Sequence, residues 1–194
     1  MTKPDAPSGL SLWAYVGAAA GMIASAALTE HAMGRKLWGI SGQPGIWSGN
    51  VESEHNSQYL FDPYSFSHVT HGVLLYGLLW LTARKLPTRA RILIAIAIEC
   101  AWEVIENTDM VINRYRAATI SLHYYGDSIM NSMCDILACI AGLMLASLLP
   151  ARVSIVFVVL LEVMLALWIH DNLALNILML IHPVQVIRTW QNGG

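Results

Sequence analysis

The chain has 194 residues, of which 56% are hydrophobic and only 12% are charged, with a formal net charge of −2. Soluble domains carry about 25% charged residues, so this deficit points to a lipid environment. The basic residues form short clusters rather than an extended basic face, which excludes nucleic acid as a partner. We therefore predict an all-α membrane helix bundle that forms one domain over residues 1–194.

Five apolar segments long enough to span a membrane follow one another along the chain, and we expect each to form a transmembrane helix. The first lacks charged residues, but its Ala24-Ser25-Ala26 also resembles a signal-peptide cleavage site, so cleavage stays an alternative. A polar extramembrane loop at residues 30–62 separates it from the others. The five segments cover residues 10–28, 64–83, 90–112, 127–149 and 153–169.

A sixth apolar stretch, at residues 173–181, follows the polar triplet His170-Asp171-Asn172. It is too short to span a hydrocarbon core, so we expect a short interfacial or re-entrant helix that ends near Pro183.

Basic residues in short connectors indicate which side of the bundle is cytoplasmic. The densest group lies between the second and third helices, and we expect that side, with the N-terminus, to be cytoplasmic. The basic residues of this side are Arg84, Lys85, Arg89, Arg91, Arg152 and Lys3.

An alternating five-helix path brings four polar helix ends to the opposite side. Residues three, four or seven apart share one helix face, so the ionisable residues form stripes. A lone charge in lipid costs at least ~2.5 kcal/mol on insertion scales, and we expect the stripes to pack together as one polar site. The site collects Ser67, His68 and His71; Glu103, Glu106 and Asn107; Asp127, Asn131 and Asp135; and His170 and Asp171.

Within this site, His68 and His71 are candidate ligands of a divalent metal. Two histidines and one carboxylate, with an open position, form several catalytic zinc and iron sites. The candidate catalytic residues are Glu103, Glu106 and Asp127, with either glutamate as a ligand or general base in metal-dependent hydrolysis at the membrane surface. No helix carries Glu-x-x-His or His-Glu-x-x-His, so convergence alone supports this hypothesis.

Cations and aromatic rings beside the same helix ends suggest a membrane lipid or a small lipid-like molecule as a ligand. Two arginines can clamp a phosphate or carboxylate, and tyrosines suit the headgroup region. An ordinary aromatic belt with anchoring arginines is the simpler explanation of these residues. The candidate ligand-binding residues are Arg114, Arg116, Tyr125, Asn131 and Asp135.

Two other functions fit the same pattern. In one, the protein is a non-catalytic assembly or stabilising factor, and its polar side chains only hold the helices together, at about 0.6 kcal/mol per contact. In the other, the carboxylates and histidines form a proton or ion relay that Glu99 and Glu162 extend towards the other leaflet. The pattern names no protein partner and leaves the three functions open.

Several stretches resemble an uncharacterised family of multi-pass bacterial inner-membrane proteins of unknown function. The resemblance is most specific in the second to fourth helices and covers about two thirds of the chain. It implies a place in the bacterial inner membrane but no activity, cofactor or catalytic residue. The stretches are SFSHVTHG at 65–72, AWEVIENT at 101–108, INRYR at 112–116, YYGDS at 124–128, Asn131-Ser132, Asp135 and Asp171-Asn172-Leu173.

Overall fold

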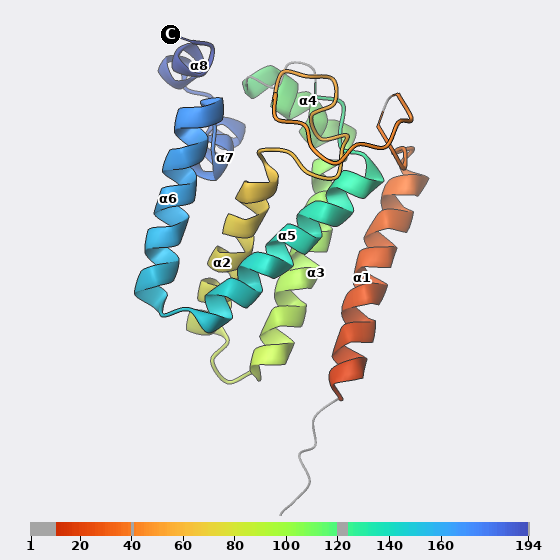
Figure 1. The fold of residues 1–194 in the computed structure, drawn as a ribbon, viewed down its shortest axis with the longest axis vertical. Coiled ribbons are helices and arrows are strands. Elements are labelled where there is room, and N and C mark those ends of the chain that lie inside the picture. The colour runs from red at the N-terminus through yellow and green to blue at the C-terminus, as the bar shows by residue number, and fades with distance from the viewer. Residues whose placement is uncertain (1–10, 40, 120–123, 194) are drawn as a thin grey trace, which may run out of the picture.

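A computed structural model describes residues 11–39, 41–119 and 124–193, and Lys3 lies outside these ranges. The described residues form eight helices and no strand beyond an isolated bridge between Trp47 and Phe61 (Figure 1). The predicted all-α fold class is therefore confirmed. The helices are α1 (Leu12–Ala32), α2 (Ser65–Thr82), α3 (Thr88–Glu106), α4 (Asp109–Ala118), α5 (Ile129–Leu148), α6 (Ala151–Ile169), α7 (Leu173–Ile181) and α8 (Gln185–Gln191).

The five long helices alternate in direction (Figure 1). The α2–α3 and α5–α6 connectors lie at one end of the bundle, and the loop after α1, with α4, α7 and α8, lies at the other. The expected meeting of four polar helix ends is therefore seen in the structure, and we call this end the capped end.

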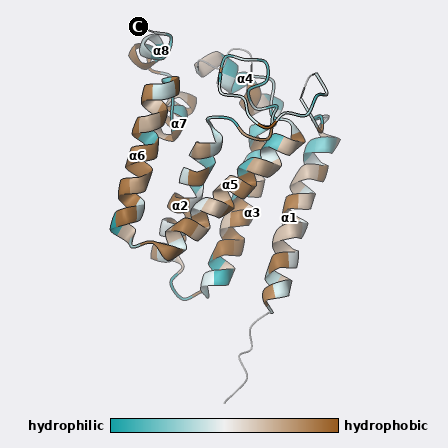
Figure 2. Cartoon of the chain, in the orientation of Figure 1, coloured by the Kyte–Doolittle hydropathy of each residue, from teal (hydrophilic) through white to brown (hydrophobic). Residues whose placement is uncertain are grey.

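Three helices, rather than the predicted five, are long and apolar enough to cross a membrane: α1, α5 and α6. The helices α2 and α3 have the length but are too polar. Serines and histidines occupy the first two turns of α2, and α3 carries two arginines and three glutamates. The outer faces of α1 and α6 are largely apolar (Figure 2), which agrees with a membrane protein.

The predicted third helix, at residues 90–112, is interrupted at its polar end. It stops at Glu106, and a second helix, α4, begins at Asp109. The Thr108 hydroxyl caps α4 by accepting a hydrogen bond from the Val111 N–H, as favoured N-cap residues do. The short α7 has the predicted bounds of residues 173–181, whereas α8 was not expected.

Two glycines let α2 and α5 pack backbone to backbone. A Cβ at Gly72 would overlap the Cys139 carbonyl, and one at Gly142 would overlap the Val69 carbonyl. Small residues permit such close approach between helices in membranes. This contact fixes the position of Asp135 on α5 relative to His68 on α2. The distance between Asp135 Oδ2 and His68 Nε2 is 4.0 Å.

The loop after α1 is folded onto the capped end rather than forming a loose tether. The Ser128 N–H donates to the Ser57 carbonyl at 2.9 Å, and the Ser128 hydroxyl donates to the Gln58 carbonyl at 3.0 Å. The Asn131 side-chain amide donates to the Tyr59 carbonyl at 3.0 Å. Residues 57–59 of the loop therefore cover the start of α5.

Candidate functional site

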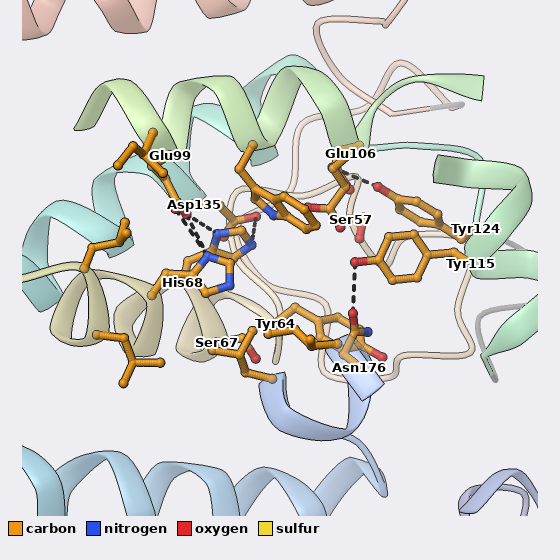
Figure 3. A pocket seen from close by; sticks show the side chains of 18 of the residues that line it. Ser57, Tyr64, Ser67, His68, Glu99, Glu106, Tyr115, Tyr124, Asp135 and Asn176 are labelled. Carbon is orange, nitrogen blue, oxygen red and sulfur yellow. Dashed lines mark hydrogen bonds and ion pairs between the residues drawn. The ribbon is translucent and has the colours of Figure 1, made fainter. Parts of the chain in front are cut away.

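A cavity of about 330 Å³ lies beneath this loop, bordered by α2, α3, α4, α5 and α7 (Figure 3). Histidine, carboxylate and tyrosine side chains line one part of it, and Leu, Ile and Trp side chains line another. Ligand pockets are concave sites that combine apolar walls with a few convergent polar groups, and this cavity has that character. Of the candidate metal and catalytic residues, His68, His71, Glu106 and Asp127 line it, as does Asp135.

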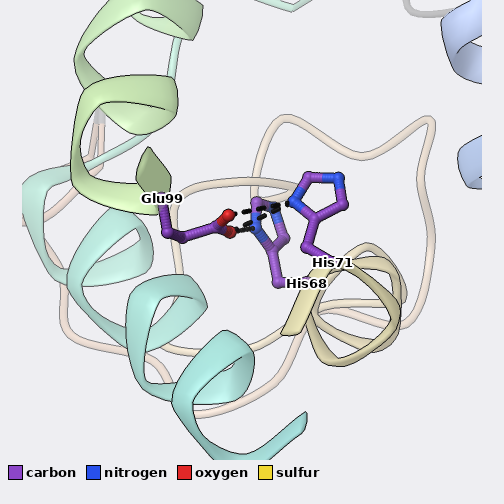
Figure 4. A group of neighbouring side chains, drawn as sticks. All are labelled: His68, His71 and Glu99. Carbon is purple, nitrogen blue, oxygen red and sulfur yellow. Dashed lines mark hydrogen bonds and ion pairs between the residues drawn. The ribbon is translucent and has the colours of Figure 1, made fainter. Parts of the chain in front are cut away.

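The centre of the site is formed by His68, His71 and Glu99 (Figure 4). His68 Nδ1 lies 2.7 Å from Glu99 Oε1, and His71 Nδ1 lies 3.1 and 3.2 Å from its two carboxylate oxygens. The two imidazoles are three residues apart on α2, so both project from one helix face. One ligand atom from each of the three residues lies within 4.8 Å of the others.

A second group of carboxylates surrounds His68. Glu103 Oε1 lies 3.2 Å from His68 Nδ1 but makes no hydrogen bond, and the side chain is buried. His68, Glu103 and Glu106 also present one ligand atom each within 4.8 Å. Glu106 lines the cavity, whereas Glu103 is not among its lining residues. The two predicted catalytic glutamates therefore occupy different places, one on the wall and one behind it.

The break between α3 and α4 holds Asp127 at the capped end. The buried Asn107 amide donates to Asp127 Oδ2 at 2.9 Å, and Asn107 Oδ1 accepts from the Asp127 N–H at 2.7 Å. The Tyr124 hydroxyl also donates to Asp127 Oδ2, at 3.0 Å. Burial raises the pKa of Asp127 to about 6, because the desolvation of its charge outweighs these hydrogen bonds.

Negative charge exceeds positive charge throughout this region. Four carboxylates line the cavity, from Glu99, Glu106, Asp127 and Asp135, whereas its basic residues are the two histidines. No Lys or Arg is buried among the residues that the structure describes. Buried charges require pairing, protonation or a metal ion, so the cavity requires bound protons or a cation in addition to its two histidines.

The other candidate ligand-binding residues lie outside the cavity lining. Arg114 donates from Nε to the Leu180 carbonyl at 2.8 Å, so it caps the C-terminal end of α7. Arg116 stacks its guanidinium on the Tyr125 ring at 4.8 Å. Asn131 holds the loop over α5 through the Tyr59 carbonyl. The positions of these residues fit structural roles.

A second polar network, centred on Asp171, joins α2, α7 and α8 beside the cavity. The buried carboxylate accepts hydrogen bonds from the Asn172 N–H at 2.9 Å and from the Gln191 amide at 3.1 Å. It also accepts from the Tyr64 hydroxyl at 3.2 Å and the Asn176 amide at 3.4 Å. Burial raises the pKa of Asp171 to about 6 in spite of these donors.

Glu99 is the member of the central group that was missing from the predicted ligands. Helical spacing places Glu99 on the same face of α3 as Glu103 and Glu106, the two glutamates that we predicted as ligands. The choice depends on how α2 and α3 are aligned along their axes, which periodicity does not determine. Lining residues Tyr64, Trp102 and Asn176 likewise come together only through the tertiary fold.

Comparison with known proteins identifies the family. The family model described as "Protein of unknown function (DUF2585)" matches residues 30–193. This chain belongs to that family. It is 49% identical over 184 residues to a UPF0314 protein of Sinorhizobium fredii, a match that covers 94% of this chain and 93% of the relative.

Other relatives match at similar levels. A UPF0314 protein of Rhizobium meliloti is 47% identical over 193 residues, covering 99% of this chain and 96% of the relative. One from Paracoccus denitrificans is 45% identical over 170 residues, covering 88% of each. No solved structure matches the chain. The names of these relatives state no activity, so a function has to be argued from the site itself.

Proposed function

We propose that this protein holds a divalent metal ion through His68, His71 and Glu99 and uses it for hydrolysis at the membrane surface. The observation that carries the proposal is that two imidazoles and a carboxylate converge on the wall of a cavity. Two histidines and a glutamate are the protein ligands of several catalytic zinc sites, which leave a position open for water or substrate. A divalent ion here would also offset the excess of buried carboxylates.

The residues around the centre have the chemistry that hydrolysis requires. A divalent ion bound at this site would act as a Lewis acid and would lower the pKa of water bound to it to about 7. Glu106 faces the cavity within 4.8 Å of His68 and is the general base of the proposal. It takes a proton from water as the oxygen bonds to the carbonyl carbon or phosphorus, and then returns that proton to the departing alcohol oxygen. Two further carboxylates lie near this base: Glu103, within 4.8 Å of Glu106, and Asp127 in the cavity wall.

We further propose that the protein crosses the bacterial inner membrane several times, with its N-terminus in the cytoplasm. The basic connector between α2 and α3 and Arg152 beside the α5–α6 connector lie at the end opposite the cavity (Figure 1). The positive-inside rule favours that end as cytoplasmic. Labelling of intact cells with an impermeant thiol reagent tests this orientation. The Glu54→Cys variant should react and the Lys85→Cys variant should not, since both positions are exposed and lie at opposite ends.

A proton relay has less support from the geometry. The relay hypothesis needs Glu162 as a step towards the other side, but its Oε2 accepts a hydrogen bond from the Ala174 N–H at the start of α7. Beyond Val73, α2 carries no Asp, Glu, His, Lys or Arg. The remaining alternative is that the polar cluster only holds the helices together. In that case, substitutions of its charged residues would change stability but no ligand binding or activity.

Glu106→Gln separates the hydrolase from the architectural alternative. Detergent-purified protein reloaded with Zn²⁺ or Mn²⁺ is assayed against carboxylic ester and phosphoester substrates. We expect Glu106→Gln to retain metal and lose about 10²- to 10⁴-fold in kcat, as for loss of a general base. His68→Ala should lose both metal and activity. Turnover equal to wild type in both variants would contradict the proposed mechanism.

A further inference from the structure

The cavity has two chemically different parts along the bundle axis. Its apolar part includes Leu74, one turn from His71 on α2, and Ile98, which precedes Glu99 on α3. Each lies beyond the metal ligands of its own helix, away from the capped end, because α2 runs from that end and α3 runs towards it (Figure 1). They line the cavity while remaining 51% and 43% exposed, so the cavity opens there on the side of the bundle.

This side opening lies midway along the bundle, close to a helix that suits a hydrocarbon environment. Leu74 and Ile98 are near the middle of α2 and α3, which pack against α5, a helix apolar enough to cross a membrane. Their exposed faces would meet lipid chains rather than water in such a setting. A molecule that enters here must itself be apolar where it passes the opening.

The part of the cavity nearer the capped end combines acidic side chains with the apolar Leu173 and Ile177 of α7. Figure 3 shows Glu106, Tyr115, Tyr124 and Asn176 gathered there, away from His68 and Glu99. Tyr115 donates its hydroxyl proton to Asn176 Oδ1 at 3.0 Å, and Tyr124 donates its own to Asp127 at 3.0 Å. These two hydroxyl protons are thus engaged within the protein, and the Glu106 and Asp127 carboxyl groups remain as the acidic groups of this part. Such a surface favours a cationic group.

We propose that the substrate is a single-chain amphiphile with an ammonium head, held with its head at Asp127 and its chain at Leu74 and Ile98. The metal ligands lie between these two parts, where the bond joining head to chain would sit. This inference rests on the proposed hydrolysis for its reaction: water adds to the carbonyl carbon of a linking ester, and the products are the acid and the amino alcohol. The binding itself requires no turnover.

Photolabelling of metal-free protein tests the binding without depending on catalysis. The probe is a choline ester of a long-chain fatty acid with a diazirine in its chain, and the comparison probe is the same fatty acid with a free carboxylate. Peptide mapping by mass spectrometry should place the choline ester on α2 and α3 around Leu74 and Ile98. We expect the carboxylate probe to label this region at least about tenfold less, a difference of about 1.4 kcal/mol.

Leu74→Trp provides a variant that fills the opening, and Leu78→Trp is its matched control. Leu78 is one turn farther along α2, is similarly exposed and does not line the cavity. Leu74→Trp should reduce labelling about tenfold, because excluding about two methylene groups from the cavity costs that much. Leu78→Trp should label like wild type, and zinc content should be unchanged in both.

The outcomes separate this inference from the proposed metal centre. Bound zinc with no choline-ester labelling at the cavity would overturn the inference and leave the metal centre standing. Specific labelling in a chain that binds no metal would overturn the metal centre and leave the amphiphile site. Equal labelling by both probes, or labelling spread over the outer faces of α1 and α6, would also overturn the inference.

Discussion

From the middle of the bundle towards the α2–α3 and α5–α6 connectors, α2 and α5 meet through glycines and aliphatic residues, with Gly72 against the Cys139 backbone. In the capped half, the same two helices meet through polar groups: the Ser65 hydroxyl donates to Asp135 Oδ1 at 2.7 Å, and His68 lies beside the same carboxylate. Close backbone packing stabilises one half, whereas the other half carries the cost of buried charge. The comparison indicates that the apolar half fixes the geometry that the polar half requires.

Alanine substitution at Gly72 should have the largest effect on this arrangement. Its new Cβ would collide with backbone atoms of α5, which cannot rotate away, so we expect a loss of about 3 kcal/mol or more. Gly77→Ala is the matched control, because nothing lies within 4 Å of its Cβ position. That change should raise stability by about 0.5–1 kcal/mol, since Gly is a poor helix former. Thermal unfolding in detergent measures both, and equal melting temperatures would refute the close-packing account.

Removing the Asp171 carboxylate should have the next largest effect. Asp171→Ala leaves Tyr64, Asn176 and Gln191 without their shared acceptor, and we expect a loss of about 2–3 kcal/mol. Asp109→Ala is the control, because its side chain is 92% exposed, and surface changes usually stay within about 0.5 kcal/mol. If the two variants unfold at the same temperature in detergent, the Asp171 network is not stabilising.

A pH series should show the cost of the buried carboxylates. The pKa of Asp127 is about 6 in the folded chain against an ordinary value of 3.8, so the folded state holds this proton more tightly. The stability that this proton contributes is therefore fully present below pH ~4, is lost as the pH rises to ~6 and stays level above, a change of about 3 kcal/mol. Asp171 titrates over the same window, with a pKa of about 6.

Asp127→Asn should remove part of this slope and leave the part due to Asp171. Melting temperatures of wild type and variant between pH 4 and pH 8 test the prediction. Parallel curves would mean that Asp127 does not titrate in this range.

Arg114→Ala should have the smallest effect of the series. The variant loses the hydrogen bond from Nε to the Leu180 carbonyl at the end of α7, which is worth about 1 kcal/mol. Because Arg114 does not line the cavity, zinc content and photolabelling should match wild type. Reduced labelling would instead support the sequence-based prediction that this arginine binds the ligand.

The sequence predicted the helical class and the meeting of polar helix ends, because both follow from hydropathy and alternating direction. It also placed His68 and His71 on one face through their helical spacing. It did not predict Glu99 as the third ligand, because that depends on the axial alignment of α2 against α3. The excess of predicted spans arose because α2 and α3 have the length of a span, but the serines and histidines of α2 and the five charged residues of α3 make them too polar.

The roles of the arginines show a similar limit. A Lys or Arg beside an aromatic cluster predicts a cation near a headgroup, but only the fold shows Arg114 capping α7 and Arg116 stacked on Tyr125. Local pattern thus identified the polar site as a region, and tertiary contacts decide which side chains face the cavity.

Zinc content after loading and dialysis tests the central claim most directly. Mass spectrometry of the metal compares wild type with the His68→Ala/His71→Ala double variant and with His31→Ala/His182→Ala, whose two histidines are exposed and outside the cavity. We predict about one zinc ion per chain in wild type and in the control, and a near-complete loss in the first variant. Folded wild-type protein that retains no zinc, manganese or iron, or a double variant that retains as much as wild type, would contradict the proposed metal centre.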